Sequence, residues 1–116
     1  MNRMLVLLAT AAAGLSLVAS SAAAPVKLTG TVGPGFTITL KKGGAKVTTL
    51  KAGTYKFVVT DKSNIHNFHL KGPVSKVITT VAAKGTKTVT LKLKKGKYTY
   101  VCDPHASSMR GSFRVV

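Results

Sequence analysis

Residues 87–102 read KTVTLKLKKGKYTYVC, and this stretch indicates the fold. Apolar and aromatic side chains alternate with Lys or Thr on both sides of the turn at Lys95-Gly96. A period of two places one set of side chains on a buried face and the other in water, which is the pattern of a half-buried β-strand. Because a Gly-containing turn separates the two runs, the stretch predicts two successive strands.

The same alternation continues from Pro25 to the end of the chain, and helical spacing is absent. We predict an all-β, Greek-key β-sandwich of about seven or eight strands. The predicted strands are residues 26–32, 36–41, 54–60, 67–71, 76–81, 87–94, 97–102 and 112–116. The side chains expected in the core are Phe36, Ile38, Leu40, Tyr55, Phe57, Val59, Val89, Leu91, Leu93, Phe113 and Val115.

An internal similarity adds one detail to this pattern. Residues 50–59, LKAGTYKFVV, match residues 93–102, LKKGKYTYVC, at five of ten positions. In this alignment Cys102 takes the place of Val59, which is one of the residues expected to point inward. We therefore expect the thiol at the inner end of a core strand.

The first 24 residues have the organisation of an export signal. Arg3 gives a basic start, residues 4–18 are mostly apolar, and small residues follow up to Ala24. The alternative is an uncleaved membrane anchor, but the apolar stretch is shorter than the roughly 20 residues that span a bilayer. We expect cleavage within residues 22–24, one mature domain over residues 25–116, and export to the periplasm or the outside of the cell.

The charge is strongly one-sided. The chain has 18 Lys and Arg against two acids, Asp61 and Asp103, for a net charge of +16. Such a surface attracts acidic proteins, anionic cell-envelope polymers or nucleic acid, and charge alone does not choose among them.

The only cysteine begins a loop rich in metal-binding side chains. Cys102 cannot form a disulfide within the chain, so it is either an inert buried thiol or a reactive one. His105 and Met109 follow it in residues 102–109, CDPHASSM. A thiolate, an imidazole and a thioether together suit copper, whereas zinc has little use for a thioether. Electron-transfer copper sites use a thiolate with two imidazoles and a weak axial Met, so one imidazole is missing from this loop.

The missing imidazole is either His66 or His69, and strand parity separates them. In residues 66–71, HNFHLK, His66 shares a face with Phe68 and Leu70, whereas His69 shares the other with Asn67 and Lys71. The apolar face must point inward. We therefore expect His66 to reach a metal at the end of the sandwich and His69 to face solvent.

Three motifs give the chain a resemblance to the cupredoxins, the blue copper proteins of the plastocyanin, pseudoazurin and azurin type. Residues 100–105, YVCDPH, resemble that family's aromatic-x-Cys-Ser-Pro-His motif. Residues 109–115, MRGSFRV, resemble its Met-x-Gly-x-apolar-x-Val ending, and His66-Asn67 resembles its upstream His-Asn pair. Two departures are Ile65, where a Pro often precedes the first ligand, and an azurin-like spacing of three residues between His105 and Met109.

The resemblance implies one type 1 copper ion bound by His66, Cys102, His105 and Met109, the last as axial ligand. It implies that Asn67 ties the His66 segment to the Cys102 loop by hydrogen bonds. Pro104 would stiffen that loop because its φ angle is fixed. In the family electrons leave through the C-terminal His, which here places His105 beside an apolar rim containing Pro34, Phe36 and Ala106.

The predicted function is that of a monomeric carrier of single electrons. The cationic surface indicates a redox partner protein with an acidic docking surface, or an anionic cell-envelope surface. Nucleic acid is not the expected partner. Copper storage or delivery, and a metal-free basic module for anionic polymers, are the alternatives. An enzyme is disfavoured because only His69 is left to build an open or second metal site.

Overall fold

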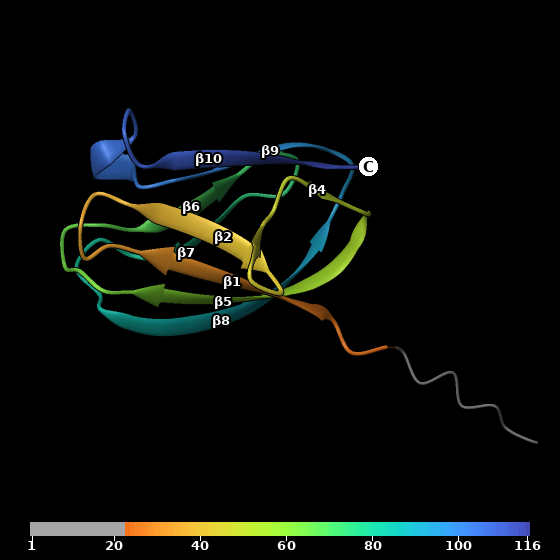
Figure 1. The fold of residues 1–116 in the computed structure, drawn as a ribbon, viewed down its shortest axis with the longest axis horizontal. Helices are drawn as coiled ribbons and strands as arrows, with labels where there is room; N and C mark the ends of the chain where they lie inside the picture. The colour runs from red at the N-terminus through yellow and green to blue at the C-terminus, as the bar shows by residue number, and fades with distance from the viewer. Residues whose placement is uncertain (1–22) are drawn as a thin grey trace, which may run out of the picture.

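The computed structural model of the protein describes residues 23–116, which form a sandwich of two five-stranded sheets (Figure 1). The first sheet has the order β3-β2-β1-β5-β8 and the second β4-β10-β9-β6-β7. The strands are β1 (Val26–Val32), β2 (Ile38–Lys42), β3 (Ala45–Lys46), β4 (Thr49–Leu50), β5 (Gly53–Asp61), β6 (Phe68–Lys71), β7 (Lys76–Thr79), β8 (Gly85–Leu93), β9 (Gly96–Val101) and β10 (Arg110–Val115). The described residues contain one short 3₁₀ helix, η1 (Asp103–His105), and no α-helix. The predicted all-β sandwich is confirmed, with ten strands instead of seven or eight.

The predicted export signal, residues 1–24, lies outside the described residues except for its last two positions. Within residues 23–116, no helix is long and apolar enough to cross a membrane.

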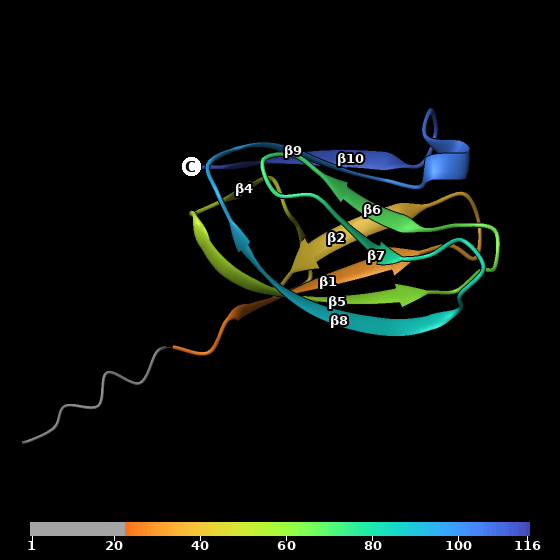
Figure 2. The same cartoon turned by 180° about the vertical axis from the view of Figure 1, so that it is seen from behind.

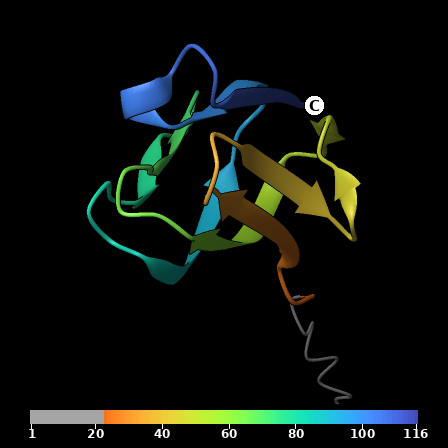
Figure 3. The same ribbon diagram turned by 60° about the vertical axis from the view of Figure 1, so that its left-hand side comes forward.

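The two sheets form separate layers, with the C-terminal strands in one and β1 in the other (Figure 3). In the first sheet β5 is an interior strand, next to the edge strand β8, and it pairs in parallel with β1 and antiparallel with β8. In the second sheet β9 is central, between β10 and β6, and both pairings are antiparallel. Strands β7 and β8, which lie at the edges of the two sheets, are adjacent on one side of the sandwich (Figure 2). The similar segments 50–59 and 93–102 thus each contribute to an interior strand, one in each sheet.

Alternate residues of both sheets fill the space between the layers. The rings of Tyr98 and Phe113 stack with their centroids 5.2 Å apart, and those of Phe68 and Tyr100 stack at 5.6 Å. Gly111 faces the Tyr100 ring, and a Cβ there would overlap the ring and its hydroxyl. Each large apolar side chain buried in this core stabilises the fold by about 1.5–3 kcal/mol. The alternation of the sequence is therefore the direct cause of the two-layer packing.

The structure corrects several predicted core positions and strand limits. Phe36 is neither in a strand nor in the core, because the bend at Pro34-Gly35-Phe36 delays β2 until Ile38 and leaves Phe36 61% exposed. Val89 and Leu91 are only half buried, because β8 is an edge strand with a neighbour on one side. The predicted strand over residues 76–81 ends at residue 79. The sequence pattern also missed the two-residue strands β3 and β4.

Candidate metal centre

Three connections gather at one end of the sandwich, opposite to the C-terminus (Figure 1). They are the turn between β1 and β2, the loop between β5 and β6, and the segment between β9 and β10 that contains η1. Because β1, β5 and β9 all end there, residues far apart in the sequence meet at this pole.

His66 belongs to the loop between β5 and β6, which local hydrogen bonds hold. The backbone N–H of Ser63 donates to Asp61 Oδ1 at 3.1 Å, and the N–H of Ile65 donates to Ser63 Oγ at 3.3 Å. These turns bring the chain back into the sandwich just before Phe68, and His66 is fully buried. Ile65 is exposed, and His69 is half buried.

Cys102 follows β9 directly, one residue beyond the strand that was predicted to contain it. It is fully buried, and a one-turn helix with Pro104 in its first turn brings His105 back towards it. The backbone N–H of His105 donates to Cys102 O at 3.0 Å, and that of Met109 donates to His105 O at 2.8 Å. The N–H of Cys102 donates to Met109 O at 3.0 Å, which closes the loop. The backbone therefore fixes the positions of all three side chains.

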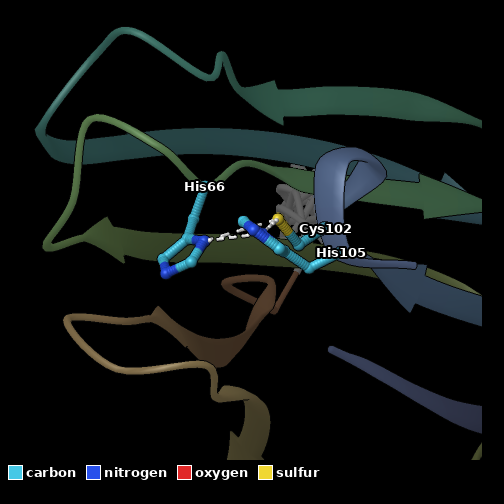
Figure 4. Close-up of side chains that lie close together, drawn as sticks. All are labelled: His66, Cys102 and His105. Carbon is cyan, nitrogen blue, oxygen red and sulfur yellow. Dashed lines mark hydrogen bonds between the residues drawn. The ribbon is translucent and has the colours of Figure 1, made fainter. Parts of the chain in front are cut away.

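Three side-chain atoms converge between these loops (Figure 4). The Nδ1 atoms of His66 and His105 are 3.1 Å apart, and Cys102 Sγ lies 3.7 Å from the first and 3.5 Å from the second. The point equidistant from the corners of this triangle is about 2.0 Å from each atom, close to the ~2.0–2.3 Å at which imidazole nitrogen and thiolate sulfur bind a metal. The three residues thus fit a single metal ion, and a set of one thiolate and two imidazoles suits copper.

A comparison with protein families identifies the chain at this point. A family model described as copper-binding proteins of the plastocyanin/azurin family matches residues 34–116, which include all three converging residues. The chain belongs to this family. The predicted cupredoxin resemblance is therefore confirmed.

Solved structures of cupredoxins share the fold. A reduced rusticyanin is 23% identical, with 78% of each chain covered and a TM-score of 0.54. A rusticyanin from Thiobacillus ferrooxidans is 22% identical, with 78% of this chain and 76% of that chain covered and a TM-score of 0.50. One chain of a heme-copper terminal oxidase dimer is 18% identical, with 78% of this chain and 63% of that chain covered and a TM-score of 0.54. At these identities the likeness concerns the fold alone. No curated protein sequence matches the chain.

The family and the arrangement of the site together support one type 1 copper site, formed by the set His66, Cys102, His105 and Met109. Met109 is fully buried and immediately precedes β10. Its backbone bonds to Cys102 and His105 keep it in the same loop as these two residues.

Asn67 joins the two segments that carry the converging side chains. It is 3% exposed, its Oδ1 accepts from the backbone N–H of Asp103 at 2.7 Å, and its Nδ2 donates to Asp103 Oδ2 at 2.8 Å. These are the kind of hydrogen bonds expected between the His66 segment and the Cys102 loop. Pairing on both sides of the amide holds the two segments in one relative position.

Asp103 and His69 form a pair on the outer side of this cupredoxin site. His69 Nδ1 lies 3.0 Å from both oxygens of Asp103, and Lys71 Nζ lies 3.6 Å from Oδ1. Burial raises the pKa of Asp103, but hydrogen bonds from Asn67 and His69 and the charges of His69 and Lys71 outweigh it, so that the pKa lies below the ordinary 3.8. His69 faces away from the converging atoms as predicted, yet it is paired and its side chain is only 23% exposed. Sequence reasoning missed the role of Asp103, although its rarity as one of two acids was a signal.

Phe36 covers the imidazoles instead of filling the core. Its ring lies edge-on to His66 and His105, with centroid distances of 5.5 Å and 4.9 Å. Pro34 and Ala106 are exposed as well, whereas His105 is half buried. The three apolar residues expected near the exit of the site are thus at the surface on the side of His105.

Proposed function

We propose that this protein is an exported blue copper protein that carries single electrons. His66, Cys102 and His105 would bind the copper ion, and Met109 would be its fourth, weaker ligand. The observation that carries the proposal is the triangle of Cys102 Sγ and the two Nδ1 atoms, with sides of 3.1–3.7 Å. Bound copper would supply a Cu(I)/Cu(II) couple and so take up and release one electron at a time.

The protein part of this mechanism is to hold the ligands in one arrangement. Cu(I) and Cu(II) prefer different geometries, so a site that resists rearrangement loses little energy when the electron moves. The loop bonds between Cys102, His105 and Met109 and the amide of Asn67 provide this resistance. Burial of His66 and Cys102 keeps water from adding as a further ligand.

The edge of His105 is the proposed place of electron exchange. It is the only one of the four ligands that is not fully buried, and the exposed Phe36 lies beside it. An apolar patch at this point allows close approach of a redox partner, and the large excess of Lys and Arg over acids in the chain favours a partner with an acidic docking surface or an anionic envelope surface. The same positive charge favours the reduced site, so we expect a fairly high reduction potential.

The location and domain limits follow from the N-terminal pattern. We propose that residues 1–24 are removed on export and that residues 25–116 form the working domain, in the periplasm or outside the cell. We also propose that the protein is not an enzyme. The one remaining imidazole, His69, is paired with Asp103 and lies outside the converging set, which leaves no residue in the described part of the chain for a second metal centre.

The test is repeated oxidation and reduction of the copper-loaded mature protein. We expect an intense visible thiolate-to-copper band that disappears with ascorbate and returns with ferricyanide over many cycles, while copper stays bound after gel filtration. Loss of copper in each reduced cycle would instead favour copper delivery. Absence of copper binding would favour a metal-free basic module.

A matched pair of variants tests the choice of histidine. His66→Gln should abolish the intense band, because it removes one corner of the triangle. His69→Gln removes the same type of side chain three residues away and should leave the band in place. The reverse result would exclude the proposed ligand set.

A further inference from the structure

Two buried polar atoms stand apart from the rest of the described chain. Within residues 23–116, Asp61 Oδ2 and His66 Nε2 are the buried side-chain nitrogen or oxygen atoms that have no hydrogen-bond partner. A buried polar atom without a partner costs about 1–3 kcal/mol, so native proteins pair nearly all of them, with protein groups or with ordered water. Because both atoms lie at the same end of the sandwich, one hydrogen-bonded arrangement that includes both would explain their burial.

Both residues lie beside the end of β1. Asp61 is the register partner of Val32, and the N–H of Lys62 donates to Val32 O at 2.9 Å. The next residue, Gly33, has a φ of +68°, and a Cβ there would lie 3.0 Å from Cδ2 of His66, the carbon bonded to Nε2. The same Cβ would lie 3.3 Å from Ser63 Cβ, and Ser63 is the residue whose N–H Asp61 Oδ1 accepts. The position of Gly33, next to both His66 and Ser63, therefore indicates that the side chains of His66 and Asp61 lie in the same region.

The two atoms are complementary in hydrogen bonding. Nδ1 of His66 faces Cys102 and His105, so the ring proton of a neutral, metal-binding imidazole must be on Nε2. Nε2 is then a donor, and a carboxylate oxygen is an acceptor. Metal-binding histidines almost always donate their second N–H to a carboxylate, a carbonyl or a water, which fixes the tautomer and the ring orientation.

The charge distribution supports a local role for Asp61. It is one of only two acids in a chain with 18 Lys and Arg, yet it is 2% exposed. Within the described residues, the ion pairs all involve the other acid, Asp103. A carboxylate buried without a cation is costly, so pairing with a Lys or Arg does not explain its position.

We propose that Asp61 is the positioning residue for His66. Its Oδ1 holds the turn that leads to the histidine by accepting from Ser63 N–H. Its Oδ2 accepts a hydrogen bond from one buried water, and that water accepts from His66 Nε2–H, which keeps the ring proton on Nε2 and leaves Nδ1 free to bind the metal. This inference rests on the proposed function of His66 as a ligand, but its first test needs no metal.

The first test measures the tautomer of His66 by ¹⁵N NMR on copper-free mature protein at pH 8. Asp61→Asn is the sharpest variant, because its amide oxygen still accepts from Ser63 N–H while its NH₂ group cannot accept from the bridging water. We expect the Nε2–H form to dominate in the wild type, and its ratio to the Nδ1–H form to fall at least threefold in Asp61→Asn. Asn64→Lys adds the same unit of positive charge at an exposed position of this loop and should not change the ratio. An unchanged ratio in a folded Asp61→Asn variant would overturn the proposal.

The second test measures copper affinity by competition with a chelator. Loss of an outer hydrogen bond to a ligand typically weakens metal binding about 10–100-fold, so we expect a fall of that order in Asp61→Asn and none in Asn64→Lys. If the wild type binds no copper, the proposed function fails while the tautomer result still decides the role of Asp61. If copper binds equally well to both variants, the positioning role is wrong although the proposed function stands.

Discussion

The segments 50–59 and 93–102 share a sequence pattern and a local structure, yet only one of them ends in a metal centre. Leu50 and Leu93 are both buried, and Gly53 and Gly96 both have positive φ, at +157° and +143°. In each segment a tyrosine hydroxyl donates to the backbone oxygen four residues earlier, from Tyr55 to Lys51 at 2.6 Å and from Tyr98 to Lys94 at 2.8 Å. The same hydrogen bond thus anchors the start of an interior strand in each sheet.

The difference lies at the other end of the two strands. β5 continues past Val59 to Asp61 within its sheet, so Val59 is an ordinary core residue. β9 ends at Val101, and Cys102 turns directly into η1, which carries His105. The same local structure therefore ends in a core residue in the first segment and in a candidate metal ligand in the second. The reason is that β5 continues through Val59, whereas β9 ends directly before Cys102.

The largest expected effect comes from making the second segment end like the first. Cys102→Val should abolish the intense visible band and tight copper binding, because it removes the sulfur corner of the triangle. The fold should survive at a cost of about 1–3 kcal/mol, since both side chains are apolar but Val adds one heavy atom at a fully buried position. Visible spectra and urea unfolding of the copper-free protein measure the two effects.

The converse variant is the control. Val59→Cys adds a buried thiol in the first segment, away from the two converging imidazoles, and should leave one copper per molecule with an unchanged band. A second copper bound by Val59→Cys, or a band retained in Cys102→Val, would show that the end of the strand does not decide the chemistry.

The next largest effect should come from the two hydrogen bonds between Asn67 and Asp103, the residue that directly follows the second segment. Asn67→Ala removes both hydrogen bonds to Asp103 and should destabilise the copper-free protein by about 1–3 kcal/mol, as measured by urea unfolding. Copper should also leave the reduced protein faster. Asn64→Ala changes an exposed asparagine of the same loop and should affect neither quantity. Equal stability of the two variants would mean that these hydrogen bonds do not hold the loops.

A smaller effect on stability should distinguish the tyrosine hydrogen bonds at the start of the two segments. Tyr98→Phe and Tyr55→Phe each remove a hydroxyl, at a cost of about 0.5–1.5 kcal/mol per hydrogen bond. We expect Tyr98→Phe to cost more, because the Tyr98 hydroxyl also accepts from Lys94 N–H at 3.1 Å. Neither variant should shift the visible band. A larger loss for Tyr55→Phe, measured in the copper-free protein, would contradict this order.

The smallest effect concerns pH. Burial raises the pKa of Asp103, but its hydrogen bonds and the neighbouring charges outweigh this and lower the pKa below 3.8. A lowered pKa means that the ionised form stabilises the fold above about pH 4, and that this contribution is lost as the pH falls through the folded-state value. Copper-free wild type should therefore lose stability in acid more steeply than Asp103→Asn. If the stabilities of wild type and Asp103→Asn fall in parallel below pH 4, the pairing of Asp103 with His69 does not stabilise the fold.

Much of this architecture was predictable because a period-two pattern fixes which side chains face the core. The same parity separated His66 from His69, whereas the burial of Asp61, one residue beyond the predicted strand 54–60, was not predicted. The pattern was misleading at Phe36, where alternation continues across a Pro-Gly bend that takes the residue out of the sheet. An alternating pattern depends only on residues that are close in the sequence, so it does not predict a bend that is stabilised by contacts with distant residues.

The network around Asp103 was beyond prediction for a different reason. It depends on the pairing of β6 with β9, which places His69 opposite Val101 and so beside the loop that follows. Such a register links residues more than thirty positions apart and is set by the packing of the whole sheet. The ligand types were therefore readable from the chain, whereas the contacts that orient them required the fold.

The most direct test of the ligand assignment is a crystal structure of the copper-loaded mature protein, with copper located by its anomalous scattering. We expect a single copper peak at the centre of the triangle, bonded to His66 Nδ1, Cys102 Sγ and His105 Nδ1, with the sulfur of Met109 at a longer distance. A principal copper peak on His69, or one without Cys102 among its ligands, would contradict the proposed site.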